Sequence, residues 1–206
     1  TLNSGALLAR GNSGTTLTIG SAANDGFLDF ANGEGIVTTV GANYVYGFNT
    51  VAGGLAINSV IQNGSLTKGG YGTLHLYGNN TFAGPLVVNS GGRDGNNDDA
   101  LRIYGTQATT DIHLYGSKTF LQANDVLNPA ASPMVDSAGQ LNLNGYTQTF
   151  KNLQNGPNGG GTVTGGDTSI LTLNPDAGDT NTFTGSFSGL ARLVKEGPNV
   201  LAIGVT

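Results

Sequence analysis

The chain of 206 residues has no cysteine, no tryptophan, one methionine and six prolines, and only 10% of its residues are charged. Without cysteine it has neither a disulfide framework nor a thiolate metal site. Its eight basic and 13 acidic residues give a formal net charge of −5, which argues against a nucleic-acid partner. It also lacks an apolar run of about 20 residues, so we expect no direct membrane span.

Glycine, by contrast, is abundant, with 35 residues, and glycine, threonine, asparagine and serine together make up almost half of the chain. The longest stretch without glycine or proline is Ser117–Asn128. Ordinary helices cannot recur in such a chain, because an interior glycine costs ~1 kcal/mol and a proline ~3 kcal/mol. The glycines follow no strict three-residue period, which excludes collagen. The composition therefore predicts an all-β protein of short strands and tight turns.

One short pattern recurs along the chain: an aliphatic residue, any residue, a second aliphatic residue, then glycine or asparagine within two residues. Apolar alternation with a period of two indicates a half-buried strand with its aliphatic side chains inward. The glycine or asparagine that follows tolerates the positive φ of a tight turn. The copies begin at Leu17, Leu55, Leu74, Leu101, Ile112, Leu141, Leu171 and Leu201.

The spacing of these strands favours a solenoid. An interval of about 27–30 residues between strands of one type predicts one coil per interval, as in repeat proteins. We therefore expect residues 1–206 to form a single segment of right-handed parallel β-helix with about seven coils. A β-sandwich or jelly roll, which also consists of short alternating strands, is the alternative. The intervals in question are Leu74 to Leu101, Ile112 to Leu141, Leu141 to Leu171 and Leu171 to Leu201.

A specific motif lies in residues 66–84. It reads Leu66-Thr67-Lys68-Gly69-Gly70, then Thr73-Leu74-His75-Leu76-Tyr77-Gly78, then Asn80-Thr81-Phe82-Ala83-Gly84. This run resembles the autotransporter-associated β-strand repeat (passenger-associated transport repeat) family. The resemblance is clearer over residues 60–206 and weaker over 1–59, and Leu121–Val135 departs from it by a small insertion. It implies a β-helical passenger or adhesin region of a protein secreted to, or exposed on, a bacterial cell surface.

These observations predict a non-enzymatic extracellular protein, a stalk or adhesin segment without a cofactor. Solenoids need polar caps at their two open ends, and the sequence contains no recognisable cap. We therefore expect either an excerpt of a longer protein or a fibre subunit that packs end to end. The expected partners are further copies of the chain, end to end or side by side, or a glycan of a host or matrix.

An enzymatic alternative rests on acidic residues in a loop. Polysaccharide-cleaving enzymes use paired carboxylates, and Asp98-Asp99 is the only adjacent pair of acidic residues in the sequence. A polysaccharide-binding or polysaccharide-degrading solenoid, a lyase or hydrolase, is thus the second hypothesis. Asp94, Asn96 and Asp98 have the alternating spacing of a calcium loop, but the turn glycine and the glutamate at the twelfth position are missing. They remain a weak calcium candidate.

A polar and aromatic stripe is the other candidate for ligand binding. The side chains of His75, Arg102 and His113 should point outward, because the aliphatic residues next to them in each strand point inward. Leu101 and Ile112 are only 11 residues apart, too close for a whole coil, so their strands should lie on two faces of one rung. The stripe could contact a sugar or a neighbouring fibre, or consist of ordinary strand tyrosines. Its members are His75, Tyr77, Arg102, Tyr104, His113 and Tyr115.

Overall fold

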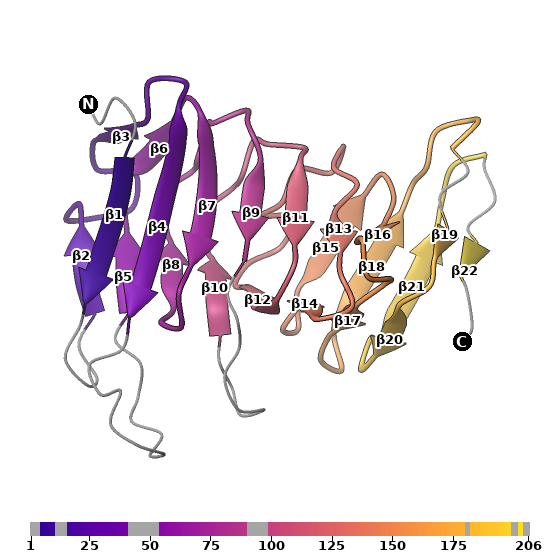
Figure 1. The fold of residues 1–206 in the computed structure, drawn as a ribbon. Coiled ribbons are helices and arrows are strands. Elements are labelled where there is room, and N and C mark those ends of the chain that lie inside the picture. The colour runs from indigo at the N-terminus through magenta and orange to yellow at the C-terminus, as the bar shows by residue number, and fades with distance from the viewer. Residues whose placement is uncertain are drawn as a thin grey trace, which may run out of the picture.

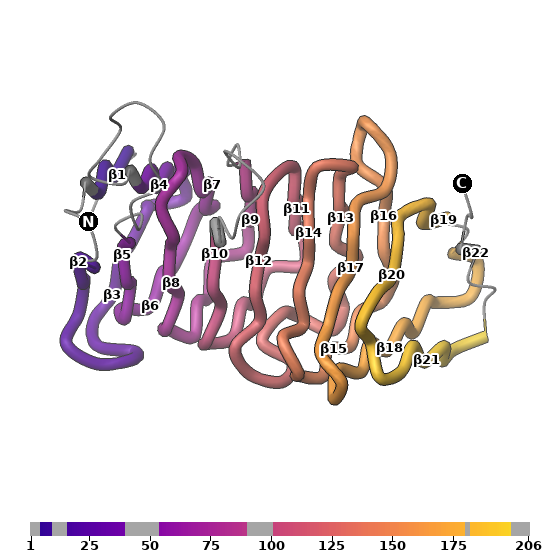
Figure 2. Tube along the Cα trace, turned by 90° about the horizontal axis from the view of Figure 1, so that it is seen from below, coloured from indigo at the N-terminus to yellow at the C-terminus, as the bar shows by residue number. Residues whose placement is uncertain are grey.

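The computed structural model describes residues 5–10, 16–40, 54–89, 99–179, 182–198 and 202–203. Over these ranges the chain is all-β, as predicted, and every pair of strands is parallel. Sandwiches and jelly rolls consist of antiparallel strands, so this pairing does not fit the alternative fold. Figures 1 and 2 show the chain advancing along the long dimension of the molecule, from the N-terminal to the C-terminal end.

Two long sheets run side by side through the molecule (Figure 1). The first sheet has seven strands: β1 (Gly5–Arg10), β4 (Glu34–Val40), β7 (Ser65–Gly69), β9 (Leu86–Val88), β11 (Ile112–Leu114), β13 (Met134–Val135) and β16 (Gln154–Asn155). The second sheet has eight strands: β2 (Thr16–Ile19), β5 (Gly54–Ile57), β8 (Leu74–Leu76), β10 (Asp99–Ile103), β12 (Ser117–Leu121), β14 (Gly139–Asn142), β17 (Thr162–Thr164) and β20 (Ser186–Ser188).

A third side is less continuous than the two long sheets. It consists of shorter sheets, β3 (Phe27–Asp29) with β6 (Val60–Gln62), and β15 (Thr147–Phe150) with β18 (Ile170–Leu173) and β21 (Arg192–Lys195). Between them, isolated parallel bridges join Asn80 to Gln107 and Gln107 to Leu127. A last pair, β19 (Thr182–Phe183) with β22 (Ala202–Ile203), lies at the C-terminal end. The chain thus visits the first sheet, the second sheet and the third side in a repeated order; we call one such round a pass.

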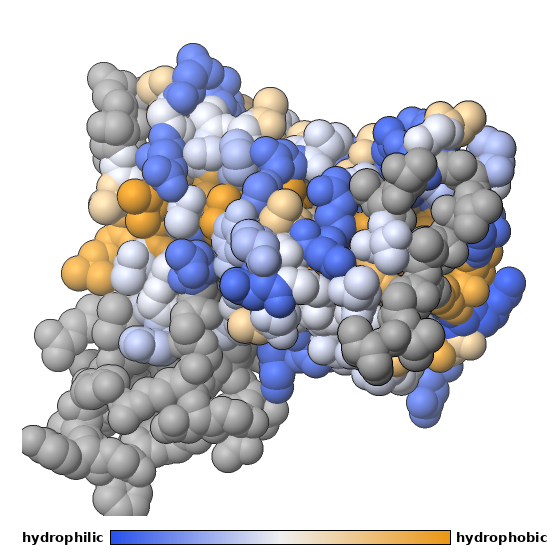
Figure 3. Space-filling view, turned by 45° about the vertical axis from the view of Figure 1, so that its right-hand side comes forward, coloured by the Kyte–Doolittle hydropathy of each residue, from blue (hydrophilic) through white to orange (hydrophobic). Residues whose placement is uncertain are grey.

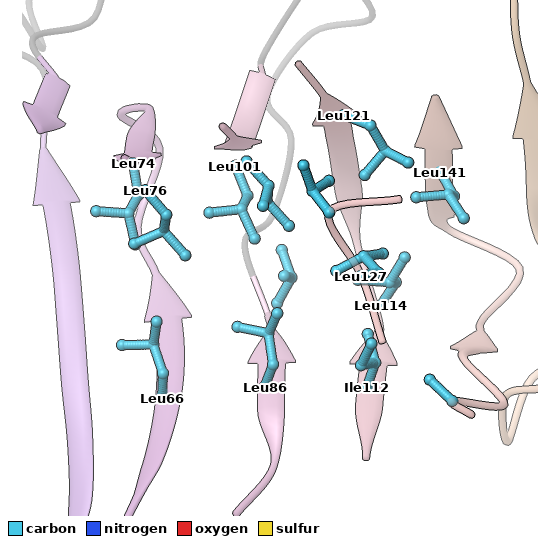
Figure 4. Packing of buried hydrophobic residues seen from close by; sticks show 14 of the residues in the cluster. Leu66, Leu74, Leu76, Leu86, Leu101, Ile112, Leu114, Leu121, Leu127 and Leu141 are labelled. Carbon is cyan, nitrogen blue, oxygen red and sulfur yellow. The ribbon is translucent and has the colours of Figure 1, made fainter. Parts of the chain in front are cut away.

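Rows of aliphatic side chains fill the interior between these sides (Figure 4). Leu55, Leu74 and Leu101 are register partners in neighbouring strands of the second sheet, and at most 2% of each side chain is exposed. Leu66 and Leu86 form the equivalent row in the first sheet and are fully buried. Removing an aliphatic side chain of this size from water contributes ~1.5–3 kcal/mol. One strand cannot bury its own apolar face, so each pass depends on its neighbours.

The predicted repeat interval is right at one place and wrong at others. Leu74 and Leu101 are direct partners, as a single coil of that length requires. Leu141, however, pairs with Val163 in the second sheet, whereas Leu171 lies in β18 on the third side. Ile112 lies in the first sheet, away from Leu141. The same aliphatic pattern occurs on all three sides, and the loops between strands differ in length, so equal spacing along the chain does not mean equal position in space.

Asparagines and glutamines connect successive passes. Asn80 is 2% exposed; its Oδ1 accepts a hydrogen bond from the Ile61 amide at 2.7 Å, and its Nδ2 donates to Gln107 Oε1 at 2.9 Å. Further along the third side, Gln148 Oε1 accepts from the Leu127 amide at 3.1 Å. The buried ladder between these passes thus joins an asparagine to a glutamine, at positions paired by an isolated parallel bridge. These bonds satisfy backbone groups that the short third-side strands leave unpaired.

Candidate interaction surface

Two strands of the second sheet place their polar residues on its outer face. In β8 and β10, His75 and Arg102 are register partners between buried leucine and isoleucine neighbours. Because successive side chains of a strand point to opposite sides, both residues project outward. Arg102 also pairs with Phe120 of β12, and its guanidinium carbon lies 5.3 Å from the centre of that ring. This distance allows a cation–π contact between the two strands.

Two tyrosines stack directly beyond these strands. Tyr77 follows β8 and Tyr104 follows β10, and the Tyr104 amide donates to the Leu76 carbonyl at 2.9 Å. The two phenol rings are 4.1 Å apart between centres, with 17° between their planes. The His75 ring is 6.2 Å from that of Tyr77 and 6.1 Å from that of Tyr104. We refer to His75, Tyr77, Arg102 and Tyr104 as the second-sheet cluster.

The protonation of the stacked phenols follows from their surroundings. Burial raises the pKa of Tyr77, and the hydrogen bond and charge of Tyr104 raise it further, whereas the positive charge of Arg102 opposes them. The Tyr77 hydroxyl therefore stays neutral at physiological pH and can both donate and accept hydrogen bonds. The cluster offers a partner hydroxyl groups, one imidazole and one guanidinium, but not a free ring face between the two tyrosines.

His113 and Tyr115 belong to a different surface. They lie at and just after β11, in the first sheet, as the short interval between Leu101 and Ile112 predicted. His113 Nδ1 is 2.8 Å from the Tyr115 hydroxyl, and its Nε2 is 2.5 Å from Asp111 Oδ1. A carboxylate can only accept, so Nε2 carries a proton, and in the neutral imidazole the Tyr115 hydroxyl donates to Nδ1. The three side chains form a hydrogen-bonded relay along one strand.

The residues of the predicted stripe therefore lie on two surfaces, and Asp111, which was not predicted from the sequence, is part of one of them. The second-sheet cluster unites four of the predicted residues, whereas His113 and Tyr115 stand apart with Asp111. Asp111 precedes His113 by two residues and Tyr115 follows by two, which is the spacing of one face of a strand. That alternation was the signal in the sequence that could have identified Asp111.

The loop proposed to hold calcium lies outside the described residues, as Asp94, Asn96 and Asp98 all do. Asp99 begins β10. Among the described residues, no group of three or more histidines or carboxylates is arranged to hold a metal ion. The same part of the chain includes no helix of the length and apolar character needed to cross a membrane.

No protein-family model matches the chain, and neither a curated protein nor a solved structure is significantly similar to it. The resemblance to the autotransporter-associated repeat thus rests on the quoted motif and stays a prediction.

Proposed function

We propose that the chain is a segment of a right-handed parallel β-helix of about seven coils, and that it is a non-enzymatic structural and interaction element. Its place would be outside the cell, as a stalk, adhesin segment or fibre subunit on a bacterial surface. This is the role implied by the resemblance of residues 60–206 to autotransporter-associated repeats.

One observation carries this proposal: the chain returns to the same sides in the same order, with parallel pairing throughout the described strands. Long parallel stacking with buried aliphatic rows gives a stiff, extended scaffold, because each pass contacts only its neighbours. Within the described residues the first sheet contributes seven strands and the second eight, and these numbers support the proposed number of coils. A scaffold of this kind presents outward residues in straight rows, which suits repeated weak contacts along a partner.

The ends of the buried rows support assembly with further copies. Leu17 continues the row of Leu55, yet 47% of it is exposed, against 2% for Leu55. Leu193 continues the row of Leu171 and is 38% exposed, while Leu171 is fully buried. Figure 3 shows hydrophobic residues gathered toward the two ends of the face in view, with hydrophilic residues over most of the middle. A second copy stacked on either end would cover this apolar surface.

Sedimentation of the purified chain over a range of concentrations tests the assembly. We expect association that increases with concentration. Leu17→Lys and Leu193→Lys should each weaken it. The matched control is Thr67→Lys, on the outer face of a central strand, which should leave end-to-end association unchanged. A native chain that stays strictly monomeric at high concentration contradicts the fibre.

Polysaccharide binding is the second candidate, and the second-sheet cluster favours it. Aromatic, imidazole and guanidinium groups side by side on an outer sheet face are suited to sugar hydroxyls. Substituting Tyr77 and Tyr104 by serine should then weaken retention on immobilised polysaccharides, whereas the exposed Tyr71 can be changed without effect. Equal retention of all variants would exclude this surface as a glycan site.

Polysaccharide degradation is the remaining alternative, and the relay of Asp111, His113 and Tyr115 is the arrangement that would supply a proton donor or acceptor. The chain is incubated with polysaccharides, and new reducing ends or unsaturated products are measured. Cleavage that Tyr115→Phe and Asp111→Asn both abolish would replace the structural proposal by an enzymatic one. We expect no cleavage.

A further inference from the structure

Tyr77 and Tyr104, at the second sheet, are stacked more closely than a scaffold or a sugar site requires. His75 pairs with Arg102 and Leu76 with Ile103, so Tyr77 and Tyr104, which directly follow these two strands, are held as neighbours. Both are half-buried, and the Tyr104 amide is tied to the Leu76 carbonyl. The backbone ladder therefore fixes the two phenols side by side.

The geometry of the rings matters for their oxidation. Their centres lie 4.1 Å apart and their planes differ by 17°. When a phenol loses one electron and one proton, the unpaired spin spreads to the ring carbons ortho to the oxygen, which in tyrosine are Cε1 and Cε2. A carbon–carbon bond between two such radicals begins through π lobes that point at right angles to the rings. Stacked rings bring those lobes face to face.

We propose that Tyr77 and Tyr104 are an oxidative cross-linking site, which a one-electron oxidant of the peroxidase class joins into a dityrosine. Each phenol gives up one electron and its hydroxyl proton, and one hydrogen peroxide is reduced to two waters. The radicals form a bond between two ring carbons, one Cε of each tyrosine, which are the carbons ortho to the hydroxyl groups. The two ring hydrogens at that bond then move to the oxygens, which restores both aromatic rings and hydroxyl groups.

The cross-link would act as a staple in a chain that has no cysteine. It would connect β8 to β10, two neighbouring strands of the second sheet, and close the loop between residues 77 and 104. A covalent closure stabilises the folded state largely by restricting the unfolded chain, as a disulfide does. This inference rests on the ring geometry alone and does not depend on the proposed stalk or adhesin role.

Other tyrosines provide internal controls. Tyr71 is 47% exposed, and Tyr115 is hydrogen-bonded to His113 on the first sheet. Trypsin cuts after lysine and arginine, so the linked tyrosines would join peptide 69–93 to peptide 103–118. Each peptide contains a second tyrosine, Tyr71 in one and Tyr115 in the other. Variants at these two positions therefore distinguish the proposed link from random oxidation.

The experiment treats the dilute, folded chain with peroxidase and hydrogen peroxide. We expect a monomer that gains dityrosine fluorescence, loses the mass of two hydrogen atoms and, after unfolding and trypsin, contains the joined peptides. Tyr77→Phe and Tyr104→Phe keep the stacked rings and should abolish the product, whereas Tyr71→Phe and Tyr115→Phe should retain it. The cross-linked monomer should also unfold at a higher temperature than the untreated chain.

Three results would overturn the proposal. The first is dityrosine that appears only between different molecules. The second is an intramolecular link that persists in Tyr104→Phe. The third is absence of the joined peptides while the same oxidant converts Tyr71 or Tyr115. Near-ultraviolet circular dichroism of each phenylalanine variant establishes that it is folded before oxidation.

Discussion

At the residue scale, Lys68 is a charged side chain inside an apolar row. It pairs with Val37 on one side and Val88 on the other, and none of the three side chains is exposed. Its Nζ donates to the carbonyls of Gly69 at 2.8 Å and Gly70 at 3.1 Å. Gly70 has a φ of 76°, a left-handed conformation that glycine adopts without strain. The lysine therefore caps the turn that ends β7.

The burial of Lys68 predicts a pH dependence of stability. Desolvation lowers its pKa from 10.5 to about 8, so between these values the unfolded chain binds more protons than the folded one. Stability should rise as the pH goes from about 8 to 10.5, by at most ~1.4 kcal/mol per unit of pKa difference. Below about pH 8 this contribution should be constant. Urea unfolding at a series of pH values measures it.

Substitution of Lys68 separates this effect from other titrations. Lys68→Met keeps the volume and the apolar surroundings without the amine, and we expect the rise above pH 8 to disappear. The control is Lys195→Met, because Lys195 makes the same kind of turn bond, to the Gly197 carbonyl at 2.8 Å, but is exposed. A rise that survives in Lys68→Met and vanishes in Lys195→Met would refute the assignment.

The buried amide of Asn80 gives a second prediction for a single residue. Asn80→Ala would leave the Ile61 amide and Gln107 Oε1 without partners in the interior. Each unsatisfied buried group costs ~1–3 kcal/mol, so the free energy of unfolding should fall by about 2 kcal/mol or more. Its exposed neighbour Asn79, changed to alanine, should cost less. Equal losses for the two variants would mean that the buried ladder has no special part in stability.

At the element scale, glycines allow successive passes to approach each other closely. A Cβ on Gly105 would lie 2.3 Å from the Gly78 carbonyl oxygen and 2.6 Å from that of Tyr77. A Cβ on Gly78 would meet the Ser59 carbonyl oxygen at 2.4 Å in the same way. Gly78 and Gly105, each two residues beyond its strand of the second sheet, thus allow neighbouring passes to stack closely.

Gly105→Ala should consequently destabilise the chain by ~1–3 kcal/mol, because backbone atoms of the neighbouring pass must move. Thermal unfolding followed by circular dichroism measures the loss. The control is Gly166→Ala, where the nearest atom to the added Cβ is 3.5 Å away, an ordinary contact. If Gly166→Ala were as harmful as Gly105→Ala, the close approach of passes would not be the reason.

The sequence could predict which way the residues of a strand point, but not which sheet every strand joins. Alternation around Leu74 and Leu76 correctly placed His75 outward, and the short interval before Ile112 correctly separated His113 from Arg102. The sheet to which Leu171 belongs could not be predicted, because one strand pattern is used on every side and loop lengths set the register. The contact between Tyr77 and Tyr104 likewise depends on that register, which no local pattern contains.

At the scale of the whole molecule, the central claim is that successive passes stack in parallel with a constant rise. Along the outer face of the first sheet, one row of register partners runs through Ala6, Ile36, Thr67, Val87, His113, Met134 and Gln154. Neighbouring strands lie ~4.8 Å apart, so the distance from Gln154 should increase by that amount with each strand. A compact two-layer fold with a different strand order would not give this progression.

Pulsed electron paramagnetic resonance measures these distances directly, because a chain without cysteine accepts spin labels only at cysteines that are introduced. One label replaces Gln154, and its partner replaces Thr67, Ile36 or Ala6 in turn. For four, five and six strand steps we expect ~19, ~24 and ~29 Å between backbones, broadened by the label arms. Distances that rise in equal steps support the stacked coil. Distances that stay constant, or change order among the three pairs, would contradict it.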